Sequence, residues 1–522
     1  MKGDGSKAGS SSRRRVRRRI GGGGAAAGGV DRISEVCDDV LLKILLLMPL
    51  VDAVRTSELS RRWAALWTRL PRLGLCDEDD YVGGGGGAGG SRFAGFVDSV
   101  LSRVAAVVPQ IPRYVIIRVF KETNFDAARI TSWASFVAAH RFAVEFHLCV
   151  AIIKVSELDS RQLPEEIVHL PCFETTKRIS LCLLYISCRL ALPTSGVFAS
   201  LTELKLHTVQ FSEFAGAAIG EVISKRCPCL EILEMETITG VLELTLHSTS
   251  LVHLDLTMVK MMELHVVAPK LQTVAVASCF QFFSSNSTAV SISAPKLQRV
   301  RWLDACPEQT HVGPIDRLHE LVVGEAMVVE EGWLLGGVHS NFDMIMRHFS
   351  RTDMLQLRIP IYPEFIGHKQ LMENIILPQH YSSLELVVEP NKHVFGSSMV
   401  CLLRRCHGLR ALHVCLGQRK QGVGTTCLYC FWDHMFSTWR NATIRLNYLE
   451  ELVIKDFNGT SHELDFLKFV CTCVVSIRKI KLVLAEGVIP TAGAYVELGF
   501  LRSKARSAEC YFIVNQAPIR FM

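Results

Sequence analysis

The sequence lacks any long uncharged apolar run. In its 522 residues no such stretch approaches the roughly 20 residues that a membrane-spanning helix requires. The longest candidate, residues 40–51, contains Lys43 and Pro49. The N-terminal arginine run is followed by glycines, whereas a secretory signal needs an apolar segment there. The sequence therefore predicts neither a membrane protein nor a secreted one.

The sequence also lacks the cysteine pattern of an oxidised, disulfide-rich domain. Several of its 18 cysteines stand beside leucine, valine or isoleucine, as Cys149, Cys182 and Cys415 do. In such surroundings a free thiol behaves as a small hydrophobe. We expect reduced cysteines and a location in the nucleus, the cytoplasm or both.

Positive charge is scarce outside the N-terminal tail. The formal net charge of the chain is +6, and residues 1–30 alone contribute +7, which leaves −1 for the rest. A nucleic-acid-binding domain normally carries a basic surface, so we do not expect the folded body to bind nucleic acid. The arginine-rich residues 13–19 fit a nuclear-import signal, a loose nucleic-acid contact, a transit peptide or a solubilising tail.

Catalytic and metal-binding patterns are incomplete. His319 and His462 each begin a zinc-protease pattern whose second histidine is missing. Cys427-x-x-Cys430 has metal-ligand spacing, with His434 nearby, but four converging ligands are not evident. The glycine-rich stretches contain no complete nucleotide-binding loop. The sequence predicts no catalytic residue, no metal ion and no cofactor.

What the sequence does contain is a recurring Leu-x-x-Leu-x-Leu pattern, with apolar equivalents. The first six copies start 20 to 29 residues apart, which is the period of leucine-rich repeats. The last two apolar positions of a copy point to one face of a strand, and stacked parallel strands bury that face. We predict a leucine-rich-repeat solenoid; a leucine-rich α/β sheet is the alternative. The copies begin at Leu201, Leu230, Leu251, Leu271, Leu297, Leu318, Leu409 and Leu449.

The solenoid is expected to be irregular. A regular repeat often has Asn or Cys eight residues after its first leucine, where it hydrogen-bonds the turn. In the first copies only Cys279 meets this rule. We therefore expect uneven loops.

Polar residues alternate with the apolar positions of the repeat strands and face outward. Their mixed charges favour a polar protein surface as the bound target, and an ordinary solvated face is the alternative. The candidate target contacts are Glu203, Lys205, His207, Glu234, His253, Asp255, Arg299, Arg301 and Glu320.

Residues 31–75 form a separate apolar module. Residues 38–48 predict a helix capped by Asp38 or Asp39 and ended by Pro49. A second helix is expected near Asp52 and a third after Ser60.

Such a small bundle cannot cover its own apolar surface, because domains below about 40 residues usually need outside help. We therefore predict that a partner protein covers the rest. The alternative is that the helices pack on the repeats of the same chain, against which the glycine-rich residues 83–90 argue.

The module contains, in this order, Asp31-Arg32-Ile33-Ser34, Asp38-Asp39-Val40-Leu41, Met48-Pro49, residues 52–57, Leu59-Ser60-Arg61-Arg62-Trp63 and Leu66-Trp67. These segments closely resemble the plant F-box. The resemblance implies that the module docks on a Skp-type adaptor, which in turn binds a cullin scaffold. The family usually has Leu-Pro where this chain has Val36-Cys37, which we expect to weaken the contact. The implied adaptor contacts are Val36, Cys37, Val40, Leu41, Ile44, Leu45, Pro49, Leu59 and Trp63.

Residues 449–470 are similar to the FBD motif found at the end of many plant F-box/leucine-rich-repeat proteins. The pattern predicts a strand, a glycine turn, a helix near 462–473 and a closing strand at 479–484. Because an open solenoid end needs a cap, we expect a capping role.

The predicted fold is α/β, with a three-helix F-box, an irregular leucine-rich-repeat solenoid and an α+β cap. The predicted function is that of the substrate-recognition subunit of a Skp–cullin–F-box ubiquitin ligase. Such a subunit positions a target and is not itself an enzyme. Alternatives are a protein-binding scaffold outside ubiquitin ligation, a nuclear nucleic-acid-associated protein that uses the arginine tail, and an enzyme with a cryptic site.

The chain is predicted to divide into five segments. They are a disordered basic tail (1–30), the F-box (31–75), a flexible acidic and glycine-rich linker (76–91), the solenoid (92–440) and the FBD-like cap (441–522).

Overall fold

The structure is a computed structural model of the full chain. The residues that it describes are 33, 35–77, 90–107, 113–120, 126–151, 166–184, 188–212, 216–283, 287–315, 317–324, 345–349, 351–360, 376–389, 395–417, 437–475, 477–488, 509–514 and 517–520. The predicted basic tail, most of the predicted linker and the Cys427, Cys430 and His434 group lie outside these residues.

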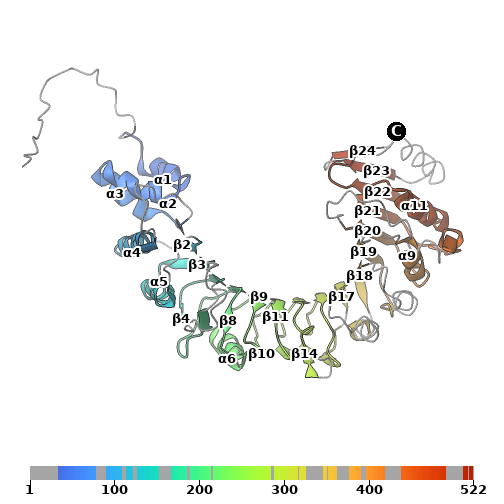
Figure 1. Ribbon diagram of the computed structural model, residues 1–522, viewed down its shortest axis with the longest axis horizontal. Coiled ribbons are helices and arrows are strands. Elements are labelled where there is room, and N and C mark those ends of the chain that lie inside the picture. Colours follow the sequence, from blue (N-terminus) through green and yellow to red (C-terminus); the bar gives the residue numbers. More distant parts are fainter. Residues whose placement is uncertain are drawn as a thin grey trace, which may run out of the picture.

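A large parallel sheet lines the inner side of an open arc (Figure 1). Its 17 strands pair in chain order. Only the pairing of β23 with β24 is antiparallel among the described strands. The strands are β1 (Arg72–Cys76), β2 (Arg113–Val119), β3 (Ala143–Val150), β5 (Arg178–Leu183), β7 (Glu203–His207), β9 (Ile232–Ile238), β11 (His253–Val259), β13 (Thr273–Ala277), β15 (Arg299–Leu303), β17 (Leu318–Gly324), β18 (Thr352–Pro360), β19 (Ser383–Glu389), β20 (Ala411–Leu416), β21 (Glu451–Phe457), β22 (Lys479–Leu484), β23 (Glu509–Val514) and β24 (Ala517–Arg520).

The leucine pattern explains why these segments become strands. In each predicted copy the last two apolar residues lie in a strand and are buried, as Leu254 and Leu256 are in β11. Equivalent positions of neighbouring strands are in register, so Leu254 pairs with Leu233 on one side and Val274 on the other. The stacked rows form one continuous hydrophobic core. The predicted α/β solenoid is confirmed.

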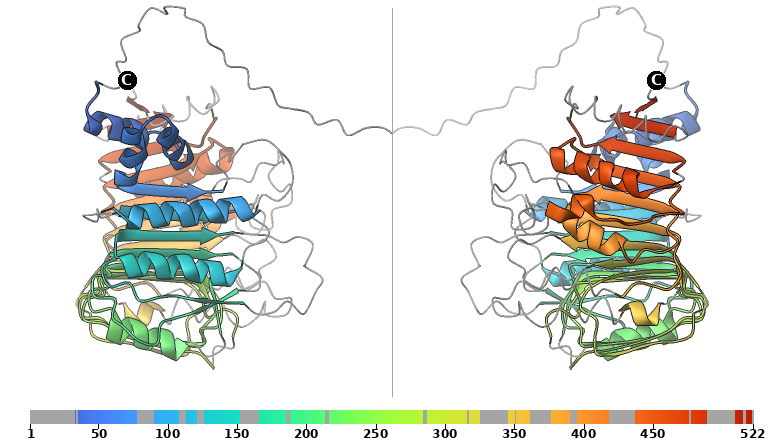
Figure 2. Two further views of the ribbon diagram at one scale, coloured as in Figure 1. Left: turned by 90° about the vertical axis from the view of Figure 1, so that its left-hand side faces the viewer. Right: turned by 90° about the vertical axis from the view of Figure 1, so that its right-hand side faces the viewer.

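The outer side of the arc is uneven, as predicted. Its middle is closed by two small sheets with α6 between them, and both ends are covered by helices that run along the strands (Figures 1 and 2). The small sheets contain β4 (Glu166–His169), β6 (Cys188–Ala191) and β8 (Gln210–Phe211), and β10 (Glu243–His247), β12 (Glu263–Val267), β14 (Ala289–Ser293) and β16 (Gln309–Val312). The helices are α4 (Gly90–Ala105), α5 (Ala127–His140), α6 (Gly216–Arg226), α9 (Gly396–Leu403) and α11 (Ser461–Cys473).

Cys279 and Asp304 hold the turns of neighbouring repeats together. The Cys279 thiol donates to the carbonyl oxygens of Leu256 (3.4 Å) and Ala277 (3.3 Å). Asp304 accepts backbone N–H groups from Cys279, Phe280 (3.0 Å) and Ala305 (2.7 Å). The one repeat that keeps the expected turn residue therefore uses it as the pattern predicts, and an aspartate performs a similar task beside it.

The N-terminal bundle consists of short helices and turns packed together. Its elements are α1 (Asp38–Leu46), α2 (Leu50–Arg55), η1 (Thr56–Glu58), α3 (Arg61–Leu66) and η2 (Trp67–Arg69). Ser60 caps α3 by accepting the N–H of Trp63. The predicted cap of α1 was wrong: Cys37 is the N-cap residue, and Asp38 and Asp39 lie in the first turn. There their charge still favours the helix N-terminus.

The bundle is not separated from the solenoid. Leu41, Leu45 and Trp67 belong to the same core as the repeats. Directly after the bundle, β1 pairs with β2 of the main sheet. The predicted linker bounds were therefore too wide, because Cys76 ends β1 and α4 begins at Gly90. The alternative prediction, that the helices pack on the repeats of the same chain, therefore holds for the face of the bundle that carries these three residues.

The C-terminal segment continues the main sheet. The predicted helix is α11, which begins with a capping box formed by Thr460 and Glu463. The predicted strand at 479–484 is β22, but it does not close the sheet, because β23 and β24 follow it. In the described part of the chain, no helix is long and apolar enough to cross a membrane.

Candidate binding surfaces

One face of α1 and the residues that flank it carry an exposed apolar row. Val40 is 44% exposed, Ile44 45% and Leu47 89%. Their spacing of four and three residues places them on one side of the helix. Leu59, which is 69% exposed, lies in the same bundle after η1. We call Val40, Ile44 and Leu47 the apolar row.

The opposite face of α1 is covered by the chain itself. Leu41 and Leu45 are each only 1% exposed and belong to the core. Their assignment as adaptor contacts was wrong, because a side chain buried in its own fold has no surface left to offer. They hold α1 in place and so position the apolar row.

The other predicted adaptor contacts lie at the surface to different degrees. Cys37 and Pro49 are exposed, and Val36 and Trp63 are half-buried against the core. Leu46 and Leu47 are exposed residues that the sequence-based prediction omitted. Leu47 could have been found by continuing the helical spacing from Val40 and Ile44.

Charged groups fix α1 against α3. Arg62 donates from Nε to the Asp38 carboxylate at 2.9 Å and also contacts the carbonyl oxygen of Val36. Arg69 reaches the second oxygen of Asp38 at 3.2 Å. These bonds hold the first turn of α1, so the apolar row is presented on a rigid element.

The predicted target contacts all lie on strands of the inner sheet. Strand register places Lys205, Glu234 and Asp255 side by side on β7, β9 and β11. The same alignment places Arg299 beside Glu320 on β15 and β17. The structure therefore brings the predicted residues to one surface, which is the concave side of the arc (Figure 1).

Much of the charge on this surface is already paired. Lys205 bridges Glu203 at 2.9 Å and Glu234 at 3.0 Å. The Lys205 pKa is raised; burial lowers it, but hydrogen bonds to the two carboxylates outweigh that effect. His207 lies 3.0 Å from Glu236. These groups are less available to a partner, because binding must compete with internal contacts.

Arginines near the centre of the arc are less constrained. Arg299 and Arg301 are exposed and have no ion-pair partner among the described residues. Arg358 on β18 is also exposed, and its side chain packs over Gly324, where an added Cβ would lie 3.3–3.4 Å from Arg358. Arg301 aligns through Val322 with Gln356, so Arg358 lies two strands away and two residues further along its strand, at about 12 Å between Cα atoms. We call Arg299, Arg301 and Arg358 the arginine cluster.

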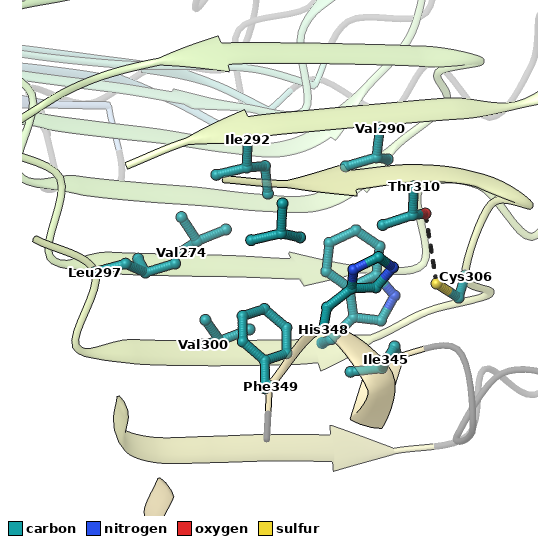
Figure 3. A pocket seen from close by; sticks show the side chains of 12 residues that line it. Val274, Val290, Ile292, Leu297, Val300, Cys306, Thr310, Ile345, His348 and Phe349 are labelled. Carbon is teal, nitrogen blue, oxygen red and sulfur yellow. Dashed lines mark hydrogen bonds between the residues drawn. The ribbon is translucent and has the colours of Figure 1, made fainter. Parts of the chain in front are cut away.

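A small apolar pocket lies inside the solenoid, between the inner sheet and β14 and β16 (Figure 3). Its titratable lining residues are Cys306 and His348. Burial raises the pKa of Cys306 to about 11, and burial lowers the pKa of His348. Cys306 contacts Thr310 (Figure 3). A thiol with a raised pKa is a poor nucleophile. The described residues also contain no cluster of three potential metal ligands.

Comparisons with known proteins match two regions of the chain. The F-box domain family matches residues 33–73, and the family described as "FBD-associated F-box protein At5g56370, LRR repeats" matches residues 138–324. These regions contain the apolar row and all nine candidate target contacts.

Relatives in Arabidopsis thaliana extend the match. The putative F-box/FBD/LRR-repeat protein At4g03220 is 26% identical over 84% of this chain and 86% of its own length. The FBD-associated F-box protein At5g22730 is 26% identical over 53% of this chain and 52% of its own length. The F-box/FBD/LRR-repeat protein At4g26340 is 30% identical over 40% of this chain and 44% of its own length. The last two matches therefore span about half of those proteins.

Proteins that combine an F-box with leucine-rich repeats generally act in substrate recognition by Skp–cullin–F-box ubiquitin ligases and are typically non-catalytic. The F-box implies interaction with a Skp-type adaptor. Over its two matched regions and its stacked parallel repeats, this chain is similar to the F-box/FBD/LRR-repeat proteins.

Proposed function

We propose that this chain is the substrate-recognition subunit of a Skp–cullin–F-box ubiquitin ligase. The observation that carries the proposal is the apolar row, which stays exposed while the opposite face of α1 is buried in the chain's own core. Exposed apolar residues gathered on one rigid helix face are typical of a protein interface. The adaptor covers this row, and the concave sheet holds the target.

The mechanism is positioning. A target held on the concave surface keeps its lysines near the activated ubiquitin that the rest of the ligase supplies. Holding two reactants together converts a bimolecular step into an effectively unimolecular one, which can lower the barrier by several kcal/mol. The chain needs no nucleophile of its own for this task.

The arginine cluster supports a further detail of the target. Arginine recognises carboxylates and phosphates through a planar fork of donors. Exposed guanidinium groups on a concave surface therefore favour a target segment that carries negative charge. The nucleus, the cytoplasm or both are the proposed location, because cysteines set beside leucine, valine or isoleucine in the sequence fit a reducing compartment.

Co-purification with a Skp-type adaptor and a cullin tests the proposal. The full chain should capture both proteins. Ile44→Asp and Leu47→Asp should each weaken adaptor binding by about tenfold to a hundredfold, because burying a Leu or Ile side chain is worth about 1.5–3 kcal/mol. Val475→Asp is the matched control, since Val475 is 80% exposed and lies far from the bundle in the chain.

Each outcome discriminates between functions. Capture of adaptor and cullin that is lost in the α1 variants supports the ligase subunit. Capture of the adaptor without the cullin favours the scaffold outside ubiquitin ligation. Failure of the folded wild-type chain to bind any adaptor overturns the proposal.

A further inference from the structure

Two cysteines on the concave surface lie directly side by side. Cys149 of β3 and Cys182 of β5 are partners in the strand register. Neighbouring strands are about 4.8 Å apart, and a disulfide needs a Cα separation of about 4.4–6.8 Å. Both residues are half-buried, and neither is in a disulfide. A bond between them therefore requires little movement of the backbone.

The surroundings make one of these thiols reactive. A hydrogen bond from the Cys182 thiol and the charge of Arg118 outweigh burial and lower the pKa of Cys149 to about 7. Arg118 is the register partner of Cys149 on β2. The hydrogen bond to Cys149 raises the pKa of Cys182, so Cys182 serves as the proton donor of the pair. On the other side of Cys182, its register partner on β7 is His207. The His207 ring nitrogen Nδ1 contacts the Glu236 carboxylate.

Another cysteine on the same surface shows the contrast. Cys415 of β20 is also half-buried, but its thiol donates to the Asp456 carboxylate at 3.5 Å. Burial and this contact raise its pKa to about 11. The fold therefore provides a matched thiol with similar exposure and the opposite electrostatics.

We propose that Cys149 and Cys182 form a dithiol site that peroxides convert to a cross-strand disulfide. The Cys149 thiolate attacks a peroxide oxygen, the O–O bond breaks, and Cys149 becomes a sulfenic acid while hydroxide leaves. The Cys182 sulfur then attacks the Cys149 sulfur as its thiol proton departs. An S–S bond forms, the S–O bond breaks, and water leaves. Two thiols and one hydrogen peroxide give one disulfide and two waters, so the sulfurs are oxidised and the peroxide is reduced.

The position of the site links it to the target surface. Cys182 neighbours His207, which is one of the candidate target contacts. A disulfide here ties β3 to β5 and removes a thiol donor from the concave face. The site thus adds a chemical modification that the proposed ligase role does not require, and it is tested independently of adaptor binding.

The test treats the reduced full chain with one equivalent of hydrogen peroxide, blocks the remaining thiols with N-ethylmaleimide and maps the products by mass spectrometry. We expect a peptide pair joined through Cys149 and Cys182, with two hydrogen atoms lost. Cys149 should react at least about tenfold faster than Cys415, since its thiolate fraction is far larger while its nucleophilicity is only partly reduced.

Variants separate the two roles. Cys182→Ser should leave a sulfenic acid at Cys149 that dimedone traps, and Cys149→Ser should abolish oxidation at Cys182. Arg118→Leu should slow the reaction severalfold, and Arg118→Lys should restore much of it. Equal reactivity of Cys149 and Cys415, or oxidation that pairs either cysteine with the exposed Cys37 or Cys229 instead, would overturn the proposal.

Discussion

The guanidinium of Arg113, at the start of β2, donates a hydrogen bond to the carbonyl oxygen of Leu70, at the end of the N-terminal bundle, at 3.1 Å. A second bond reaches the carbonyl oxygen of Thr68 at 2.7 Å. Arg113 is fully buried, and burial lowers its pKa. One side chain therefore joins the N-terminal bundle to the first strands of the solenoid.

Arg113→Leu is expected to destabilise this junction by about 3 kcal/mol. The substitution leaves two buried carbonyl oxygens without their charged donor, and such bonds are worth about 1.5–3 kcal/mol each. Urea unfolding of the full chain measures the loss, and limited proteolysis shows whether cleavage near β1 accelerates. Arg118→Leu on the exposed face of the same strand is the control. Equal stability of the two variants would contradict the joining role.

Asp304 makes stability depend on pH. Its pKa is raised to about 6, because burial outweighs the backbone N–H groups that it accepts. The folded state therefore binds a proton more tightly than the unfolded state, whose value is about 3.8. Protonated Asp304 therefore adds about 3 kcal/mol to the free energy of unfolding. This stabilisation is fully present below pH 3.8 and is lost as the pH rises through 6.

The comparison with Asp304→Asn isolates this effect, because asparagine keeps an acceptor oxygen but does not titrate. Unfolding free energy measured from pH 4 to 7 should fall more steeply in the wild type than in the variant. Parallel curves would show that Asp304 is charged in both states throughout this range.

Glu463 stabilises the turn that precedes α11. Its carboxylate accepts the N–H groups of Asn458 at 2.9 Å and Thr460 at 3.1 Å. Glu463→Ala is expected to cost about 2 kcal/mol, since it orphans two donors, and Thr460→Ala about 1 kcal/mol, the usual value of an N-cap. Glu463→Gln retains one acceptor oxygen, so its midpoint of thermal unfolding should lie between those of the wild type and Glu463→Ala. The reverse order would contradict the capping role.

Strand positions could be predicted where the leucine spacing is regular. Residues 201–323 give six consecutive copies, and each becomes a strand of the inner sheet. The strands β2, β3 and β18 were not recognised, because helices or long connections separate them from their neighbours and disturb the repeat period. Their alternating burial becomes evident only when the pairing is known.

The binding surfaces were predictable in part. Residue types showed that the bundle has excess apolar surface, but they could not show which face of α1 the chain covers. That depends on contacts with residues far away in sequence, so Leu41 and Leu45 were misassigned and Leu47 was missed. The pairing of Cys149 with Cys182 likewise depends on strand register, which no local pattern specifies.

The arginine cluster predicts the charge of the target surface. Arg299→Glu combined with Arg301→Glu should reduce retention of the target at least tenfold, because both changes replace an attractive charge with a repulsive one. Targets are captured by affinity purification with the proteasome blocked and quantified by mass spectrometry. Lys225→Glu, on the helix-covered outer side, is the control. A target retained equally by the double variant and the control would show that it binds elsewhere.

Replacing Cys37 by proline should strengthen adaptor binding. Cys37 has φ −68° and ψ 154°, which proline adopts without strain. Fixing this angle lowers the entropy of the unfolded chain and raises the unfolding free energy by about 0.4–1 kcal/mol, which does not by itself change adaptor affinity. It also restores the family's usual residue beside the apolar row. Adaptor affinity measured by calorimetry should rise severalfold in Cys37→Pro, while Cys37→Ala, which removes the thiol without fixing φ, should leave it near wild type. A gain of equal size in both variants would assign the effect to the lost thiol, and no gain in either would show that Cys37 does not limit the contact.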